Sequence, residues 1–204
     1  MPDLPALLAI SDRRRLGGLD WEAWCAGLAA AGVDGLQVRE PELDDAEVVA
    51  LAVAARRIFA PPRALFVNRR FDLALAAAAD GVHLPAAGLP VARVRMAVGE
   101  RLVIGRSTHE LDEVRRAREQ GADYVVFGPV FDTPTKRGRR APRGLAALAE
   151  AAAVGVPLFA IGGIDAARVA PVLRQGATGL AAIRAFATAE SAAEMVTALR
   201  EARA

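Results

Sequence analysis

The chain of 204 residues is poor in several residue types, and each shortage narrows the class of protein. Cys25 is the only cysteine, which excludes an intrachain disulfide and favours a reducing compartment. No run of about 18 apolar residues occurs, so no membrane-spanning helix is expected. Residues 1–5 lack the basic start of a secretory signal. With a net charge of +2 and 5% aromatic residues, nothing indicates nucleic acid. We therefore expect a cytoplasmic protein without nucleic-acid or membrane partners.

Lysine and asparagine each occur once, as Lys136 and Asn68, so 25 of the 26 basic residues are arginine. A general bias towards arginine explains the scarcity. Under such a bias, however, a retained lysine indicates a position that needs a compact ammonium group, which binds phosphate as a point charge. The two residues become informative only if the fold brings them to one place.

Short apolar runs alternate with segments of helical period, which predicts eight strands and eight helices. The predicted strands are Ala6–Ser11, Gly35–Glu40, Ala64–Asn68, Gly81–Pro85, Leu102–Ser107, Tyr124–Pro129, Pro157–Gly163 and Gly179–Arg184. The predicted helices are Trp21–Ala31, Asp44–Phe59, Phe71–Ala79, Pro90–Val98, Leu111–Gln120, Leu145–Ala153, Asp165–Gln175 and Ser191–Ala202. Gly32, Gly121 and Gly176 each follow a helical stretch, where a left-handed residue closes a helix.

Strict alternation of strand and helix requires parallel strands with right-handed crossovers. An open doubly wound sheet has the same local pattern, but eight units favour closure. No Gly-x-Gly-x-x-Gly follows the first strand, which argues against a dinucleotide fold. We predict a single α/β domain over residues 1–204, a (β/α)8 TIM barrel with its site at the carboxyl ends of the strands.

Polar residues collect at those predicted strand ends. Gln37 and Arg39 alternate with apolar neighbours, so they share one strand face, although an internal ion pair would also explain Arg39. Gly162 and Gly163 open a helix where bare backbone N–H groups suit a phosphate, unless they only make a tight turn. Arg184 follows the eighth strand, the other usual phosphate position in such barrels.

Residues 131–140 form a long basic segment in which Thr133, Thr135 and Lys136 suit an anion, although a solvated linker has similar composition. His83 and His109 could act as acid or base near neutral pH, or could be structural. The spacing of His, Cys and Glu does not indicate zinc, and no Ser nucleophile elbow is present.

Several motifs follow one another along the chain, and their combination is highly specific for one protein family. They are Gln37-Val38-Arg39-Glu40, residues 67–75, Ala79-Asp80-Gly81-Val82-His83-Leu84, residues 104–109, residues 127–136 and Ala160-Ile161-Gly162-Gly163-Ile164. Through them nearly the whole chain resembles the thiamine phosphate synthase family, which includes the TenI-like thiazole tautomerases. The resemblance implies the same barrel and a thiazole phosphate ligand. Synthases of this family also bind a pyrimidine pyrophosphate with magnesium.

The chain departs from this family at active positions. Arg69 and Gly88 stand where synthases carry magnesium-binding acids, and magnesium needs oxygen ligands. The Leu84-Pro85 step is TenI-like, but Pro129 stands where the tautomerases carry a catalytic histidine. A tautomerase needs an acid/base group and no metal.

We therefore expect a cofactor-free TenI-like thiazole tautomerase of thiamine biosynthesis that binds a thiazole phosphate. The alternatives are a thiamine phosphate synthase, for which Mg2+ would be needed, and a non-catalytic ligand-binding regulator. A homodimer is left open. The catalytic candidates are His109, Glu40 and His83. The candidates for binding substrate and phosphate are Gln37, Arg39, Asn68, Arg69, Ser107, Thr133, Thr135, Lys136, Gly162, Gly163, Ile183 and Arg184, and no metal ligand is expected.

Overall fold

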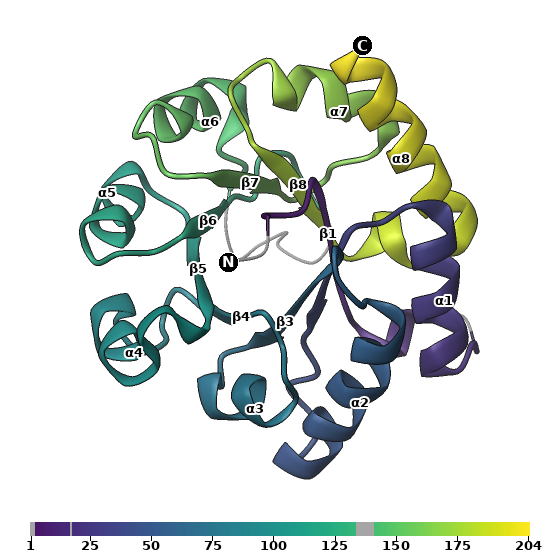
Figure 1. The fold of residues 1–204 in the computed structure, drawn as a ribbon. Helices are drawn as coiled ribbons and strands as arrows, with labels where there is room; N and C mark the ends of the chain where they lie inside the picture. The colour runs from purple at the N-terminus through teal and green to yellow at the C-terminus, as the bar shows by residue number, and fades with distance from the viewer. Residues whose placement is uncertain (1–2, 17, 134–140) are drawn as a thin grey trace.

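A computed structural model describes residues 3–16, 18–133 and 141–204 of the chain. Within these residues, parallel strands pair in chain order and the last pairs with the first, which closes a barrel (Figure 1). The strands are β1 Leu7–Ile10, β2 Gly35–Val38, β3 Ala64–Asn68, β4 Gly81–Leu84, β5 Val103–Thr108, β6 Tyr124–Phe127, β7 Leu158–Ile161 and β8 Gly179–Ala182. The predicted (β/α)8 barrel is confirmed.

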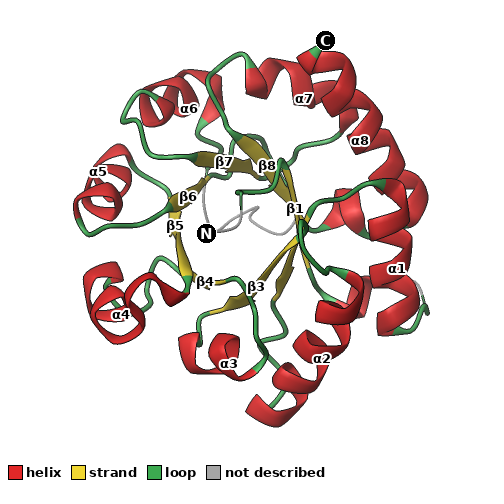
Figure 2. Ribbon diagram, in the orientation of Figure 1, coloured by secondary structure: helices red, strands yellow, loops and turns green. Residues whose placement is uncertain are grey.

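Helices surround this ring of strands, and loops join the two layers (Figure 2). The α-helices are α1 Trp21–Ala31, α2 Asp45–Ile58, α3 Phe71–Ala76, α4 Val91–Val98, α5 Leu111–Glu119, α6 Gly144–Ala152, α7 Ala166–Leu173 and α8 Ala189–Arg203. Short 3-10 turns, which were not predicted, are η1 Arg13–Arg15, η2 Gly99–Arg101 and η3 Arg184–Phe186. Arg184 was predicted to end β8 but belongs to η3, because the backbone there turns to bond Phe186 N to Ile183 O.

Several helix ends follow from single residues. Gly32, Gly121 and Gly176 have φ of 102°, 82° and 90°, the left-handed conformation predicted for them. At the other end of α2, Asp44 accepts a hydrogen bond from Glu47 N while the Glu47 carboxylate accepts one from Asp44 N. This reciprocal arrangement satisfies two N–H groups that a helix start otherwise leaves open.

A side-chain oxygen just before each even-numbered strand binds backbone N–H groups of the odd-numbered strand before it. Asp34 accepts from Ala6 N and Leu7 N. The equivalent bonds run from Leu65 N to Asp80, from Ile104 N to Asp123 and from Leu158 N to Thr178. Four pairs of strands are therefore held in register by the same local device.

The lower part of the barrel lumen is filled by three aromatic rings. Tyr124 makes edge contacts with Phe66 and Phe159, with ring centroids 5.4 and 5.2 Å apart. A Cβ on Gly105 would lie 2.1 Å from the Tyr124 ring, so only glycine admits the tyrosine there. The aromatic layer closes the lumen from below and leaves its upper part, at the strand carboxyl ends, for polar residues.

The second part of the core lies between the strands and the helices. Leu36 and Val38 of β2 face this layer, where they join buried residues of the helices such as Leu28 and Ala52. None of the described helices is long and apolar enough to cross a membrane.

The strand-pairing device can be tested at Asp80, whose carboxylate also binds Arg56 at 2.6 Å. Asp80→Ala would leave the buried Leu65 N–H and a half-buried guanidinium without their acceptor. We expect the free energy of unfolding in urea to fall by about 2–3 kcal/mol. Asp72→Ala removes a carboxylate whose ion pair with Arg70 is exposed, so its loss should stay within about 0.5 kcal/mol. Equal losses for the two variants would contradict the proposed role of Asp80.

Candidate functional site

Four polar side chains from consecutive strands form one layer at the mouth of the lumen. Asn68 donates from Nδ2 to Gln37 Oε1 at 3.0 Å. In the next pair of strands, Asn68 lies in register with His83, whose Nε2 is 2.8 Å from Ser107 Oγ. The layer therefore runs from β2 to β5. The structure brings together four of the predicted site residues.

His83 lies at the centre of this layer and is buried between two hydroxyl groups. Its Nδ1 is 3.2 Å from the Tyr124 hydroxyl, on the side opposite Ser107. Burial, with the positive charges of Arg106 and Arg39, lowers the pKa of His83 to about 3. The imidazole is thus neutral at physiological pH, which suits a hydrogen-bonding role better than that of a proton donor.

Unpaired hydrogen-bond donors lie on the β2–β3 side of the mouth. Gln37 is 1% exposed, and its Nε2 has no hydrogen-bond partner. Within the described residues, the guanidinium groups of Arg39 and Arg69 form no hydrogen bond or ion pair either. Arg69 has a φ of 70° and donates its backbone N–H to His83 O, which holds the residue at the end of β3. This side of the mouth is suited to a ligand with several negative oxygens.

The opposite side of the upper lumen is apolar. Ile161 of β7 and Ile183, just after β8, are partly buried and pack against the lumen core that contains Ile10. A flat ring could contact these side chains on one face while its polar atoms reach the β2–β5 layer. A mostly apolar surface with a few convergent polar groups is typical of small-molecule sites.

The two glycines after β7 have left-handed φ values of 102° at Gly162 and 64° at Gly163. A Cβ on Gly162 would lie 2.6 Å from Pro129, and one on Gly163 would lie 2.6 Å from the Asp132 carbonyl. The close approach of the β6 loop therefore requires both glycines, whether or not a phosphate binds beside them. Their role in phosphate binding stays a prediction.

The other two catalytic candidates differ in position. His109 lies after β5, and its Nδ1 is 2.5 Å from Gly128 O, so Nδ1 carries a proton and donates it to this carbonyl. Glu40 lies against the β1 loop, where it accepts from Arg13 N at 3.1 Å. Burial raises the pKa of Glu40 despite hydrogen bonds from Ser11 and Arg13. Glu40 therefore joins the loops after β1 and β2 at the carboxyl ends of the strands, and its catalytic role stays a prediction.

The remaining predicted residues lie around the rim. Thr133 is half-buried at the end of the described β6 loop, and Arg184 is exposed in η3. Thr135 and Lys136 lie outside the described residues, so the predicted proximity of the lone lysine and the lone asparagine stays a prediction.

Two residues of the site were missed by the sequence reasoning. Tyr124 binds His83, and the one available signal was its place as the only tyrosine of the chain, at the start of a strand. Arg106 donates to the carbonyls of Ala86 and Leu89, and so holds the loop after β4. Its position within the predicted strand β5 gave no sign of this role.

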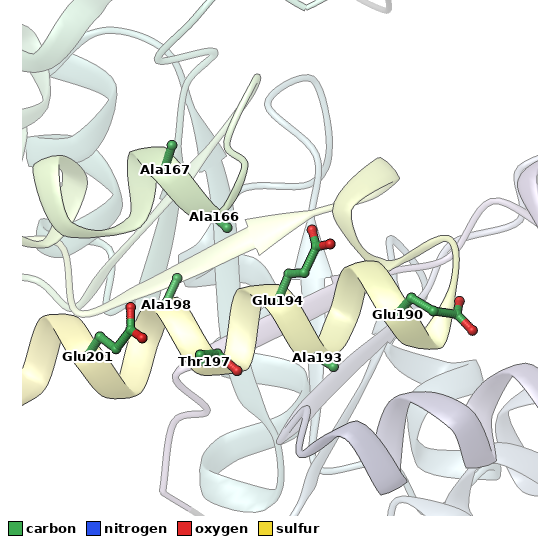
Figure 3. Close-up of a pocket in the computed structure, with 8 residues that line it drawn as sticks. All are labelled: Ala166, Ala167, Glu190, Ala193, Glu194, Thr197, Ala198 and Glu201. Carbon is green, nitrogen blue, oxygen red and sulfur yellow. The ribbon is translucent and has the colours of Figure 1, made fainter.

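An open groove lies on the outer surface between α7 and α8 (Figure 3). It has a volume of 540 Å3 and is lined by alanines, Thr197 and the carboxylates of Glu190, Glu194 and Glu201. These negative charges repel a phosphate, so the groove is not the expected ligand site.

The family resemblance links the synthase reaction to magnesium, a hard cation that binds oxygen ligands. Arg69 supplies a cation instead of a carboxylate at the end of β3, and Gly88 supplies no side chain in the loop after β4. Across the described ranges, no group of three or more His, Cys, Asp or Glu residues could hold a metal ion. Arg69 and Gly88 therefore supply no side-chain oxygen at the two positions that the resemblance links to magnesium.

The closed barrel and the polar mouth above an aromatic layer define a (β/α)8 barrel of the kind that binds small metabolites at its strand ends. The chain belongs to the thiamine monophosphate synthase family, which residues 7–186 match.

A putative thiamine-phosphate synthase of Geobacter sulfurreducens is 41% identical over 183 residues, covering 89% of this chain and 86% of that protein. The thiamine-phosphate synthase of Anaeromyxobacter dehalogenans is 44% identical over 216 residues, covering 99% and 96%. Among solved structures, thiamine phosphate pyrophosphorylase from Pyrococcus furiosus superposes with a TM-score of 0.86 at 29% identity, covering 97% of this chain and 96% of that one.

The low pKa of His83 has a consequence for stability. The unfolded chain takes up a proton on this residue near pH 6.5, whereas the folded chain does so only near pH 3. The free energy of unfolding should therefore fall by about 1.4 kcal/mol per pH unit between these values because of this group alone. In urea unfolding, the fall from pH 7 to pH 5 should be about 2 kcal/mol smaller for His83→Gln than for wild type, because the full slope applies only below pH 6.5. Parallel curves for wild type and variant would show that His83 is not held neutral.

Proposed function

We propose that this chain is a thiamine phosphate synthase, which joins a thiazole phosphate to a pyrimidine pyrophosphate. The main support is a group of donors at the β2–β3 rim that have no hydrogen-bond partner among the described residues: Gln37 Nε2 and the guanidinium groups of Arg39 and Arg69. A pyrophosphate brings several anionic oxygens, which such donors bind through charge-assisted hydrogen bonds. The names of the relatives support the same reaction.

The chemistry of this reaction matches the groups at the mouth. The bond between the pyrimidine methylene carbon and the pyrophosphate oxygen breaks, and the pyrophosphate leaves with the electron pair. The thiazole nitrogen supplies the pair for the new carbon–nitrogen bond, so no proton transfer is needed. Negative charge grows on the leaving pyrophosphate, where fixed positive groups such as Arg39 and Arg69 lower the barrier.

The division of the lumen into two faces supports two heteroaromatic substrates. Ile161 and Ile183 offer apolar contact to a ring, while Asn68 and Ser107 offer hydrogen bonds from the other side. Gly162 and Gly163 would bind the thiazole phosphate through their backbone N–H groups at the carboxyl end of β7. Arg184 follows the next strand, β8, at the same end of the barrel. Thr133, at the end of the described loop after β6, would contribute its hydroxyl to the second anionic group.

A thiazole tautomerase is the second candidate, because Arg69 and Gly88 replace both acids expected of a magnesium-dependent synthase. Its acid/base group would be His109, since both ring nitrogens of His83 are within hydrogen-bond distance of Tyr124 and Ser107 and the Glu40 carboxylate accepts from Arg13 N. Exchange of ring protons with solvent deuterium would detect this reaction. A protein that binds thiazole phosphate but shows neither activity would instead be a regulator.

The first experiment combines purified protein with thiazole phosphate and pyrimidine pyrophosphate, and measures thiamine phosphate. We expect product to form and the rate to persist in EDTA, because arginine replaces the metal-binding acid. A tenfold or greater loss of rate on chelation would contradict metal independence. Proton exchange without thiamine phosphate would favour the tautomerase and overturn the synthase proposal.

The second experiment tests the two unpaired arginines. Arg39→Gln and Arg69→Gln should each weaken the binding of inorganic pyrophosphate about tenfold or more, the effect of losing roughly 1.5–3 kcal/mol from a charged hydrogen bond. Arg93→Gln is the matched control, because Arg93 is exposed on α4 and its guanidinium forms no hydrogen bond or ion pair with a described residue. A similar loss in all three variants would mean that only net charge matters.

A further inference from the structure

Hydrogen bonds join Tyr124, His83 and Ser107 into a relay that runs from the aromatic layer to the mouth of the lumen. Tyr124 is fully buried, and its hydroxyl lies 3.2 Å from His83 Nδ1. The other ring nitrogen, Nε2, lies 2.8 Å from Ser107 Oγ, and Ser107 is only partly buried. Tyr124, at one end of the relay, is therefore buried in the core, while Ser107, at the other end, reaches the mouth of the lumen.

The sealed end fixes the direction of the hydrogen bonds. Burial raises the pKa of Tyr124, so its phenol keeps its proton. Among the described residues, His83 Nδ1 is the only hydrogen-bond partner of that phenol. A buried O–H without an acceptor is costly, so the phenol donates and Nδ1 accepts.

The direction then passes through the imidazole. A neutral histidine carries one N–H, and if Nδ1 accepts then Nε2 must be the donor. Nε2 therefore donates to Ser107 Oγ, which accepts with one lone pair. The hydroxyl hydrogen of Ser107 is left to point elsewhere, and the open side of Ser107 is the lumen.

We propose that Tyr124 is a positioning residue that acts through His83 to make Ser107 a hydrogen-bond donor to the bound ligand. That a ligand binds beside Ser107 rests on the proposed function. The ligand atom at Ser107 must accept a hydrogen bond, as a ring nitrogen or a phosphate oxygen does, and a group that can only donate is excluded. With the opposite tautomer, the Ser107 hydroxyl would donate to His83 Nε2. Ser107 could then only accept a hydrogen bond from the ligand.

The tautomer can be measured on the ligand-free wild-type protein by 15N NMR of the histidine rings, with the His83 signals assigned by their loss in His83→Gln. We expect Nε2 to be the protonated nitrogen and Nδ1 to be unprotonated. A protonated Nδ1 would overturn the proposal. Because no substrate is involved, this result is independent of the proposed function.

Variants test whether the relay reaches the ligand, with thiamine phosphate as the probe. Ser107→Ala and Tyr124→Phe should each lower affinity by about threefold to tenfold, the range for one neutral hydrogen bond. The double variant should bind no more weakly than Ser107→Ala, because both changes remove the same donor. Multiplied losses in the double variant, or full affinity in Tyr124→Phe, would overturn the relay.

Phe66→Leu is the matched control, because Phe66 packs edge-on against Tyr124 but its side chain forms no hydrogen bond with the relay. It should lower stability and leave the His83 tautomer unchanged, whereas Tyr124→Phe should remove the preference for the Nε2–H form. A tautomer change in Phe66→Leu as large as that in Tyr124→Phe would mean that packing sets it, which contradicts the proposal. If thiamine phosphate binds none of the proteins, the proposed function fails while the NMR result still decides the tautomer.

Discussion

The rest of the barrel depends on one constraint. A side-chain oxygen just before each even-numbered strand accepts hydrogen bonds from backbone N–H groups of the preceding odd-numbered strand. Asp34, Asp80, Asp123 and Thr178 make this bond at four equivalent places. Each one fixes the register of two parallel strands at their amino ends. Because residues of neighbouring strands that share a level face the lumen together, this register also decides which side chains meet at the opposite end.

The functional mouth is a consequence of that register. It sets Asn68 beside His83 and Gly105 beside Tyr124, so a tyrosine can enter the lumen and support the histidine from below. At the same end of the barrel, donors without a partner among the described residues lie on the β2–β3 side and isoleucines lie on the β7–β8 side. Charge, shape and hydrogen-bond direction at the mouth therefore come from the strand order rather than from any one loop.

The order and type of the elements could be predicted from the sequence because helix and strand periods, and glycines such as Gly32 and Gly176, are local signals. The polar strand ends followed from the same reasoning. The pairing of Tyr124 with His83 could not, since it joins residues 41 positions apart through the closure of the barrel. Likewise the bond from Arg13 N to the Glu40 carboxylate could not be predicted, since it joins residues 27 positions apart.

The central claim is that the ligand lies in the upper lumen between the polar layer and the isoleucines. NMR of methyl-labelled isoleucine and alanine, recorded during titration with thiamine phosphate in EDTA, tests it most directly. We predict saturable shifts of Ile161 and Ile183, with Ala193 and Ala198 of the outer groove unchanged. Shifts confined to Ala193 and Ala198, with the two isoleucines unmoved, would contradict the account.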